Sequence, residues 1–229
     1  MRTNLRLLST LICSFLVTAL AAAVPFKTTT ISNGKFAKGT VWYTMQIGTN
    51  QNIISDNAGA DRIKLLKVNS TLEAADLWCF VGDETKGYQI YNKQAGPGKV
   101  LASSKQMGKL AGYGGTGGST YPTMQDVNDL PADYIGTWDL KASDQLTAVD
   151  GYFVILHGTQ YAMNNFGGVG DLAFWAEGMD AGSTVSFKFA ETVVEINEAK
   201  GSFTSSNATK TWHAVWSSSV LDGLSLSTG

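Results

Sequence analysis

One arrangement of short strands recurs three times along this chain of 229 residues. Each copy begins at a tyrosine, alternates apolar with mixed positions, and turns through polar and glycine residues into a second short apolar run. The tyrosines are Tyr43, Tyr88 and Tyr152, and the second runs start 10, 12 and 9 residues after them. Alternation with a period of two predicts strands, so each copy is interpreted as a strand-turn-strand unit. Such a repeat constrains the fold because every copy has to form the same unit.

A further pair of short apolar runs follows each copy. The first run of each pair is 63–66, 110–113 and 172–175, and the second carries Trp78, Trp138 and Phe187. Three repeats of four short strands, without a convincing helix, predict an all-β chain with the β-trefoil fold. In that fold six strands close a barrel and three hairpins cap it, so that the barrel has no exposed sheet edge. A β-sandwich also has many short strands and is the alternative.

The composition agrees with a turn-rich β protein and excludes some partners. Charged residues make up 16% of the chain, against about 25% in an average globular protein. The net charge is −2, so no basic field is present to bind a phosphate backbone, and we predict no nucleic-acid partner. Glycine occurs 25 times and proline only 4 times, which suits short strands joined by many turns.

Residues 1–23 have the pattern of a secretory signal peptide. Arg2 and Arg6 precede an apolar run that ends in small residues, and cleavage is expected near Ala21 or Ala23. A membrane anchor is the alternative, and Cys13 raises a lipoprotein as another. No later stretch reaches the roughly 20 apolar residues that a spanning helix needs, so no membrane span is predicted. We expect a secreted protein, extracellular or periplasmic.

Cleavage would leave Cys79 as the only cysteine, so no intrachain disulfide is expected. Cys79 lies in an apolar run and is predicted to be a buried, inert residue. The two histidines, His157 and His213, are 56 residues apart in the sequence and have no cluster of metal ligands around them. We predict no metal and no cofactor, and a structural role for His157.

Catalytic patterns are weak in this sequence. No Gly-x-Ser-x-Gly motif appears in a strand-to-helix context. Glycosidase chemistry needs two carboxylates across a cleft, and the sequence alone pairs none. The carboxylates of interest fall in predicted turns, where solvated charge is ordinary: Asp83, Glu84, Asp171, Glu177 and Asp180. We therefore predict that these residues form no catalytic site.

Several segments carry a resemblance to a known family. They are 77–82, 87–93, 99–102, 172–175 and 181–184. They resemble the ricin-type β-trefoil modules of secreted bacterial carbohydrate-active proteins, and the resemblance covers roughly residues 38–192. It implies a non-catalytic carbohydrate-binding module. Because such modules often accompany sialidase or other glycoside hydrolase domains, it also implies an N-terminal accessory role with a covalently linked C-terminal catalytic domain.

The chain departs from that family at one motif. The family carries Gln-x-Trp near the end of each unit, whereas the matching places here are Leu77-Trp78, Thr137-Trp138 and Ser186-Phe187. The core aromatic residue is kept and the glutamine is not. Two other functions therefore stay open: a structural spacer domain, and a protein-binding, inhibitor-like β-trefoil.

Sugar recognition needs an aromatic face for C–H surfaces and planar polar groups for hydroxyls. Trp175 and Phe174 are neighbours and should point to opposite faces of their strand, so that one of them lies outside the core. Tyr113 and Tyr121 flank a glycine-rich insertion in the second unit, which could instead be a plain surface loop. Asp56 is a loose match to the sugar-binding Asp of the family, with Ser103 and Asn164 at its places in the other units. The predicted ligand residues are Asn164, Asn165, Phe166, Asp171, Trp175, Tyr113, Tyr121 and Asp56.

The pattern changes after Glu191. A segment rich in Ser, Thr and Asn is followed by a new β-like stretch that contains Trp212 and Trp216. We expect residues 193–229 to be a linker and the beginning of a second β-rich domain. A natural tail packed on the trefoil is the alternative.

Overall fold

The structure is a computed structural model, and it divides the chain into two units, Met1–Glu195 and Ile196–Gly229. The residues that it describes all belong to the first unit: 24, 26–48, 52–56, 62–67, 71–112, 119–143, 152–158, 161–166, 170–176 and 181–192. The predicted signal peptide 1–23, the segment 193–229, Tyr113, Glu177, Asp180 and His213 lie outside the described residues. No helix in the described ranges is long and apolar enough to cross a bilayer.

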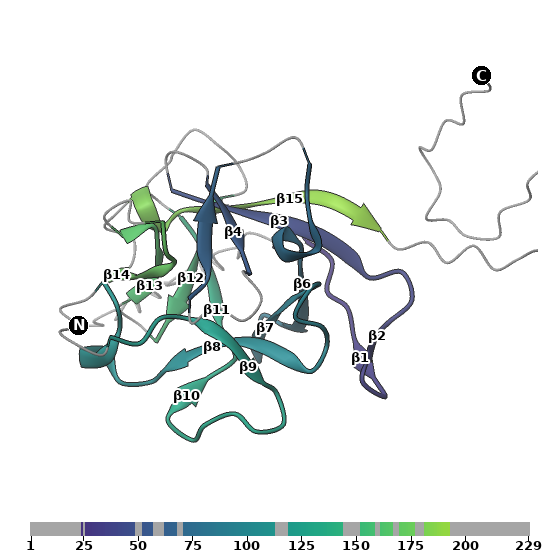
Figure 1. The fold of residues 1–229 in the computed structure, drawn as a ribbon, viewed down its shortest axis with the longest axis horizontal. Helices are drawn as coiled ribbons and strands as arrows, with labels where there is room; N and C mark the ends of the chain where they lie inside the picture. Colours follow the sequence, from purple (N-terminus) through teal and green to yellow (C-terminus); the bar gives the residue numbers. More distant parts are fainter. Residues whose placement is uncertain are drawn as a thin grey trace, which may run out of the picture. The chain divides into compact units, whose positions relative to one another are not determined.

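The pairings of six strands close a barrel, whose strands can be followed in Figure 1. In chain order they are β3 (Val41–Ile47), β6 (Trp78–Asp83), β7 (Gly87–Asn92), β11 (Asp139–Ala142), β12 (Tyr152–His157) and β15 (Val185–Thr192). Each strand pairs antiparallel with the next, and β15 returns to pair with β3. Between β7 and β11 the link is a single bridge, in which Tyr88 and Trp138 exchange main-chain hydrogen bonds of 2.8 and 2.9 Å.

Three hairpins accompany the barrel, one from each repeat. They are β4 (Asn52–Ser55) with β5 (Lys64–Leu66), β8 (Lys99–Ser104) with β9 (Thr123–Asp126), and β13 (Tyr161–Asn164) with β14 (Ala173–Ala176). A barrel of six strands with three hairpins is the β-trefoil. The predicted fold class is therefore confirmed, and the described residues contain only short 3-10 turns in place of α-helices.

The second repeat departs from the predicted strand positions. Residues 110–113 were expected to form its third strand, but the strand is β9, which follows the glycine-rich segment, and β10 (Tyr134–Ile135) adds a further pairing to β8. Leu110 makes only an isolated bridge to Thr120. Gly112 has a φ of 90°, and a Cβ there would lie 2.7 Å from the carbonyl oxygen of Phe174. This close approach to the third repeat ends the apolar run before it can pair as a strand.

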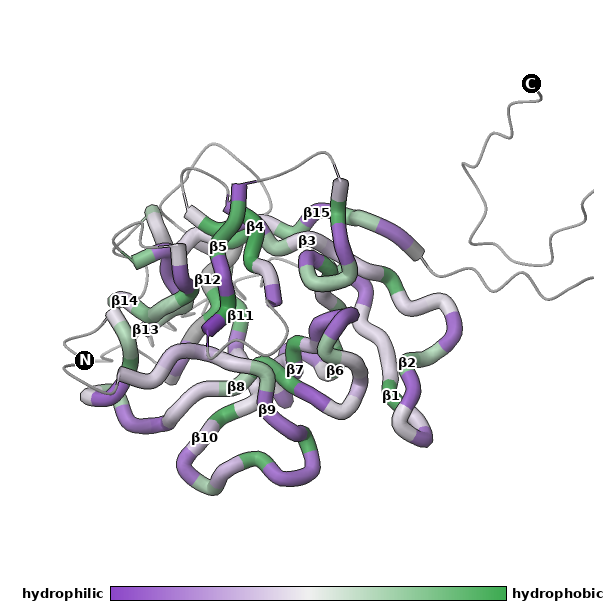
Figure 2. The backbone as a smooth tube through the Cα atoms, viewed as in Figure 1, coloured by the Kyte–Doolittle hydropathy of each residue, from purple (hydrophilic) through white to green (hydrophobic). Residues whose placement is uncertain are grey.

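The barrel interior is filled by equivalent aromatic residues from the three repeats. Trp78 donates its indole N–H to the carbonyl of Ile54 at 2.7 Å, and Trp138 donates to the carbonyl of Leu101 at 2.9 Å. Both rings are fully buried, whereas Phe187 occupies the third place without a polar atom. Figure 2 shows hydrophobic stretches in strands such as β4 and β5, while the tip of the β1–β2 hairpin is hydrophilic.

A residue near the beginning of the described chain closes the same core. The ring of Phe26 stacks on that of Phe80, with centroids 3.9 Å apart, and meets Tyr43, Tyr88 and Phe187 edge-on. The main-chain N–H of Thr29 then bonds to the carbonyl of Phe80 at 2.8 Å. Residues before position 38, the expected start of the trefoil, thus contribute to its core.

A second, smaller core lies on the outside of the barrel. The hairpin of β1 (Ile31–Ser32) and β2 (Lys35–Phe36) packs there, and Phe36 meets the rings of Trp42 and Tyr91 edge-on at 5.0 and 6.0 Å. Cys79 belongs to this cluster and is fully buried, which confirms its prediction as a buried residue. Burial raises the pKa of its thiol, so that the reactive thiolate is disfavoured.

Candidate functional site

Hydrogen bonds show which residues of the three repeats are equivalent. Asp56, after β4, donates its main-chain N–H to the carbonyl of Ala75 at 2.9 Å. Asn165, after β13, makes the same bond to the carbonyl of Gly182 at 3.1 Å. Asp56 therefore corresponds to Asn165. The sequence match of Asp56 with Asn164 was wrong by one residue, because short strands of unequal spacing give no internal marker of register.

The strand registers extend this comparison across each hairpin. The carbonyls that accept the two indole N–H groups belong to Ile54 and Leu101, so the residues before these, Ile53 and Val100, are equivalent. Ile53 pairs with Leu66, Val100 with Gln125, and Ala162 with Trp175. The same place on the three hairpins thus holds Leu66, Gln125 and Trp175.

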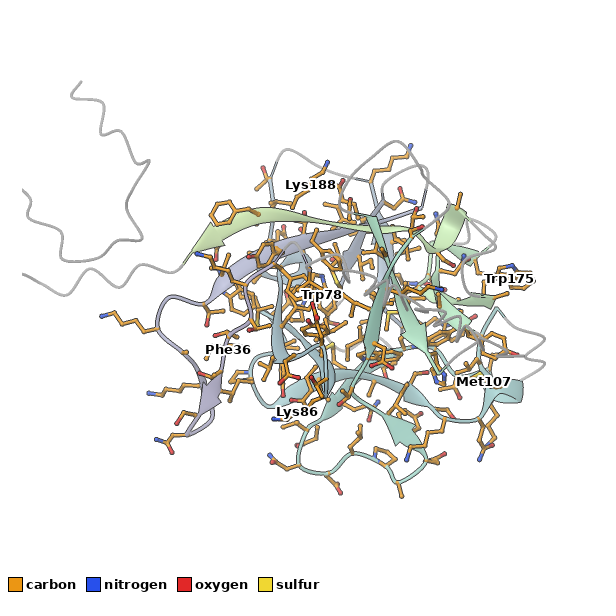
Figure 3. All side chains as sticks on the ribbon, turned by 180° about the vertical axis from the view of Figure 1, so that it is seen from behind. Phe36, Trp78, Lys86, Met107, Trp175 and Lys188 are labelled. Atoms are coloured by element: carbon orange, nitrogen blue, oxygen red, sulfur yellow. The ribbon has the colours of Figure 1, made fainter. Side chains whose placement is uncertain are left out.

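Trp175 supplies the aromatic face of the third hairpin. Its ring lies 5.3 Å from that of Phe166, tilted by 34°, and both side chains are partly exposed. In Figure 3 Trp175 lies at the edge of the protein and points outward. Its neighbour Phe174 is fully buried, so the expectation that the two side chains face opposite ways is confirmed. A Cβ at Gly112 would lie 3.0 Å from the Phe166 ring, so only glycine leaves that ring its place.

The two asparagines before Phe166 point into the protein rather than toward solvent. Asn164 is 1% exposed and donates its side-chain N–H to the hydroxyl of Ser183 at 2.9 Å. The side chain of Asn165 packs against the turn at Gly48, whose φ is 76°. Its Oδ1 is buried and has no hydrogen-bond partner among the described residues. These two predicted ligand residues thus pack on the interior side of the third hairpin.

Asp171 belongs to a charged cluster that joins the three repeats. Its carboxylate accepts hydrogen bonds from Lys64 at 2.6 Å and from Arg62 at 3.1 Å, and its side chain is 8% exposed. The guanidinium of Arg62 lies 4.1 Å above the ring of Tyr121. Burial alone would raise the pKa of Asp171, but the bonds and charges of Lys64 and Arg62 outweigh it and lower that pKa. Asp171 and Tyr121 thus lie together, joined through Arg62.

Asp56 belongs to the first repeat and follows Ser55, which pairs with Lys64 across the β4–β5 hairpin. It is 5% exposed, and burial raises the pKa of its carboxyl, while the positive charge of Lys99 acts in the opposite direction. The contacts of the described residues thus divide the predicted set into three groups: Phe166 with Trp175, Asp171 with Tyr121 through Arg62, and Asp56. Arg62 was missed, because a single charged residue before a short strand carries no sequence signal.

The described residues offer no metal centre, since no three His, Cys, Asp or Glu side chains within the described ranges lie close enough to share an ion. His157 is 2% exposed, which agrees with its predicted structural role.

No protein-family model matches the sequence, and no curated protein matches it. Solved structures similar to the chain include a GlcNAcα1-4Gal-releasing endo-β-galactosidase from Clostridium perfringens, with 12% identity, 66% of this chain and 33% of that chain covered, and a TM-score of 0.49. The chain thus spans about a third of that enzyme.

Two smaller proteins are matched over nearly their whole length. The first is a ricin B-like lectin from Macrolepiota procera in complex with lactose, with 16% identity, 70% of this chain and 99% of that chain covered, and a TM-score of 0.45. The second is the BEL β-trefoil, with 14% identity, 67% of this chain and 95% of that chain covered, and a TM-score of 0.47. One of these two similar structures is thus a ricin B-like lectin. The closed barrel and three hairpins of this chain carry the assignment themselves: it is an all-β protein with the β-trefoil fold.

Proposed function

We propose that this β-trefoil is a non-catalytic carbohydrate-binding module and that its glycan binds to the third hairpin. One observation carries the proposal. Of three equivalent hairpin positions, occupied by Leu66, Gln125 and Trp175, only the third presents an aromatic face. An aromatic ring with one exposed face offers the apolar surface on which the C–H side of a sugar packs.

The neighbouring residues support a site centred on this ring. Phe166 braces Trp175 at 5.3 Å, so the indole has a rigid neighbour instead of moving freely. Asp171 already accepts hydrogen bonds from Lys64 and Arg62, so its carboxylate has less capacity to receive sugar hydroxyls. We therefore expect Trp175 and Phe166 to provide most of the contact, with one glycan bound per chain.

A glycan array with the chain that begins at Val24 tests the proposal. Binding of any glycan class is expected, and its affinity is then measured for Trp175→Ala and for Leu66→Ala, the matched change in the first hairpin. Loss of stacking should weaken binding by about tenfold or more for Trp175→Ala, equivalent to about 1.4 kcal/mol. Leu66→Ala should bind as the unchanged protein does.

Two results would overturn the proposal. The first is an array without bound glycan while circular dichroism shows an intact fold. The second is an equal affinity of the Trp175→Ala and unchanged proteins. Inhibition of common proteases by a protein that binds no glycan would favour the inhibitor-like alternative.

We also propose that the module is secreted and acts beside a glycoside hydrolase or sialidase-like domain. The support is the leader pattern at 1–23 and the sequence resemblance. An antibody against the trefoil should detect, in the culture medium of the source cells, a polypeptide longer than 229 residues that hydrolyses glycosides. Detection only inside the cells, or of a secreted polypeptide without hydrolase activity, would contradict this part.

A further inference from the structure

A buried histidine lies between the second and third repeats. His157, at the end of β12, is 2% exposed. Its imidazole meets the ring of Trp138 at 5.9 Å and the ring of Phe174 at 5.2 Å, both in edge-to-face arrangements. Its Nε2 lies 2.7 Å from the carbonyl oxygen of Ser104. One side chain thus contacts the core of the second repeat, the hairpin of the second repeat and the hairpin of the third.

These contacts define the charge state of the ring. A carbonyl only accepts hydrogen bonds, so Nε2 carries the proton in the neutral imidazole and donates to Ser104. The second nitrogen, Nδ1, is buried and has no acceptor in hydrogen-bonding geometry among the described residues. Protonation would therefore place a charged N–H in a desolvated site, where the main-chain carbonyl of His157 itself compensates only in part.

Charged residues also lie on the segments packed against His157. Those with exposed side chains are Lys99, Lys105, Lys109, Asp139 and Lys141. Asp171, three residues before Phe174, is 5% exposed and is bonded to Arg62 and Lys64. Lys105 directs its ammonium to the carbonyl of Ala132. The pKa of His157 is lowered, because burial disfavours the imidazolium more than the main-chain carbonyls of Ser104 and of His157 itself favour it.

The third hairpin depends on this packing. Phe174, which lies against His157, is fully buried and donates its main-chain N–H to the carbonyl of Ala111 at 3.0 Å. Trp175, the aromatic residue of the proposed glycan site, is the next residue in β14. A displacement of Phe174 therefore moves Trp175 as well.

We propose that His157 is a pH-sensitive positioning residue, which orders the third hairpin when neutral and loosens it when protonated. The link to ligand release rests on the proposed function; the loosening does not. The folded state disfavours the charged ring. The free energy of unfolding therefore has its full value above the ordinary histidine pKa of about 6.5 and falls as the pH decreases below that value. Glycan bound at neutral pH would then be released in mildly acidic surroundings.

Hydrogen exchange of main-chain amides tests the proposal without any ligand. Between pH 7.5 and 5, protection in β13 and β14, corrected for the intrinsic rate, should fall about tenfold, while protection in β4 and β5 of the first hairpin should change little. His157→Gln keeps a donor for Ser104 but has no titration in this range, so its protection should not depend on pH. His213→Gln, which changes the only other histidine, should behave as the unchanged protein does.

If the His157→Gln protein fails to fold, a second measurement on the unchanged protein still tests the proposal. In the unchanged protein, the midpoint of the His157 imidazole titration, followed by NMR, should lie below the ordinary histidine pKa of about 6.5, and protection should be lost between that value and the observed midpoint. Protection that is independent of pH, that falls equally in both hairpins, or that follows His213 would overturn the proposal. Failure of the glycan array would leave these outcomes intact, so the two proposals are tested separately.

Discussion

At the scale of single residues, the indole N–H groups of Trp78 and Trp138 distinguish two of the repeats from the third. Each bonds to a main-chain carbonyl in the core, whereas Phe187 has no such group. Trp78→Phe would leave the buried carbonyl of Ile54 without this donor and create a small cavity. We expect a loss of about 2–3 kcal/mol in the free energy of unfolding, measured by urea denaturation.

The matched control is Trp175→Phe, which makes the same chemical change at a partly exposed position of the third hairpin. It should alter the free energy of unfolding by less than about 0.5 kcal/mol. Equal losses of unfolding free energy for the two variants would show that the hydrogen bond of the Trp78 indole does not stabilise the core.

At the scale of elements, the β1–β2 hairpin packs on the second, smaller core outside the barrel through Ile31 and Phe36. Only two residue pairs join its strands, and Phe36 supplies its edge-on contacts to Trp42 and Tyr91. Since Phe36 is only partly buried, Phe36→Ala should cost about 1–2 kcal/mol, less than a core phenylalanine. Limited proteolysis should then cut within residues 31–36 faster than in the unchanged protein.

Lys35→Ala, an exposed change in the same hairpin, should leave the cutting rate unaltered. If both variants were cut at the same rate as the unchanged protein, the hairpin would be held by its turn and main-chain bonds instead of by Phe36.

At the scale of the whole molecule, closure of the barrel depends on a residue near the predicted cleavage site. Phe26 fills the space between Phe80, Tyr43, Tyr88 and Phe187. Phe26→Ala should lower the free energy of unfolding by about 3–4 kcal/mol, since it opens a cavity among aromatic side chains. A chain that begins at Val24 should melt at the temperature of a longer one, and a chain that begins at Lys27 should melt well below it.

Lys27→Ala provides the control, because its side chain is exposed while its main-chain N–H still bonds to the hydroxyl of Tyr43. A Phe26→Ala protein as stable as the unchanged one would mean that the core closes without this segment.

Much of this molecule could be predicted because strand alternation and the repeated order of runs are local properties of the chain. They predicted four strands in each unit, the equivalent Trp78, Trp138 and Phe187, and the opposite orientations of Phe174 and Trp175. The error at 110–113 arose where an apolar run meets Gly112, whose close approach to Phe174 exists only after two repeats have packed together.

The sequence by itself determined the all-β class and the threefold order, because hydrophobic period and turn residues act within a few positions of each other. Tertiary structure decided which predicted ligand residues lie together. Asp171 meets Arg62 and Lys64, residues more than 100 positions away, and Phe26 meets the barrel core. Contacts at that separation depend on how the repeats close around their axis, and no local pattern in a single chain records that closure.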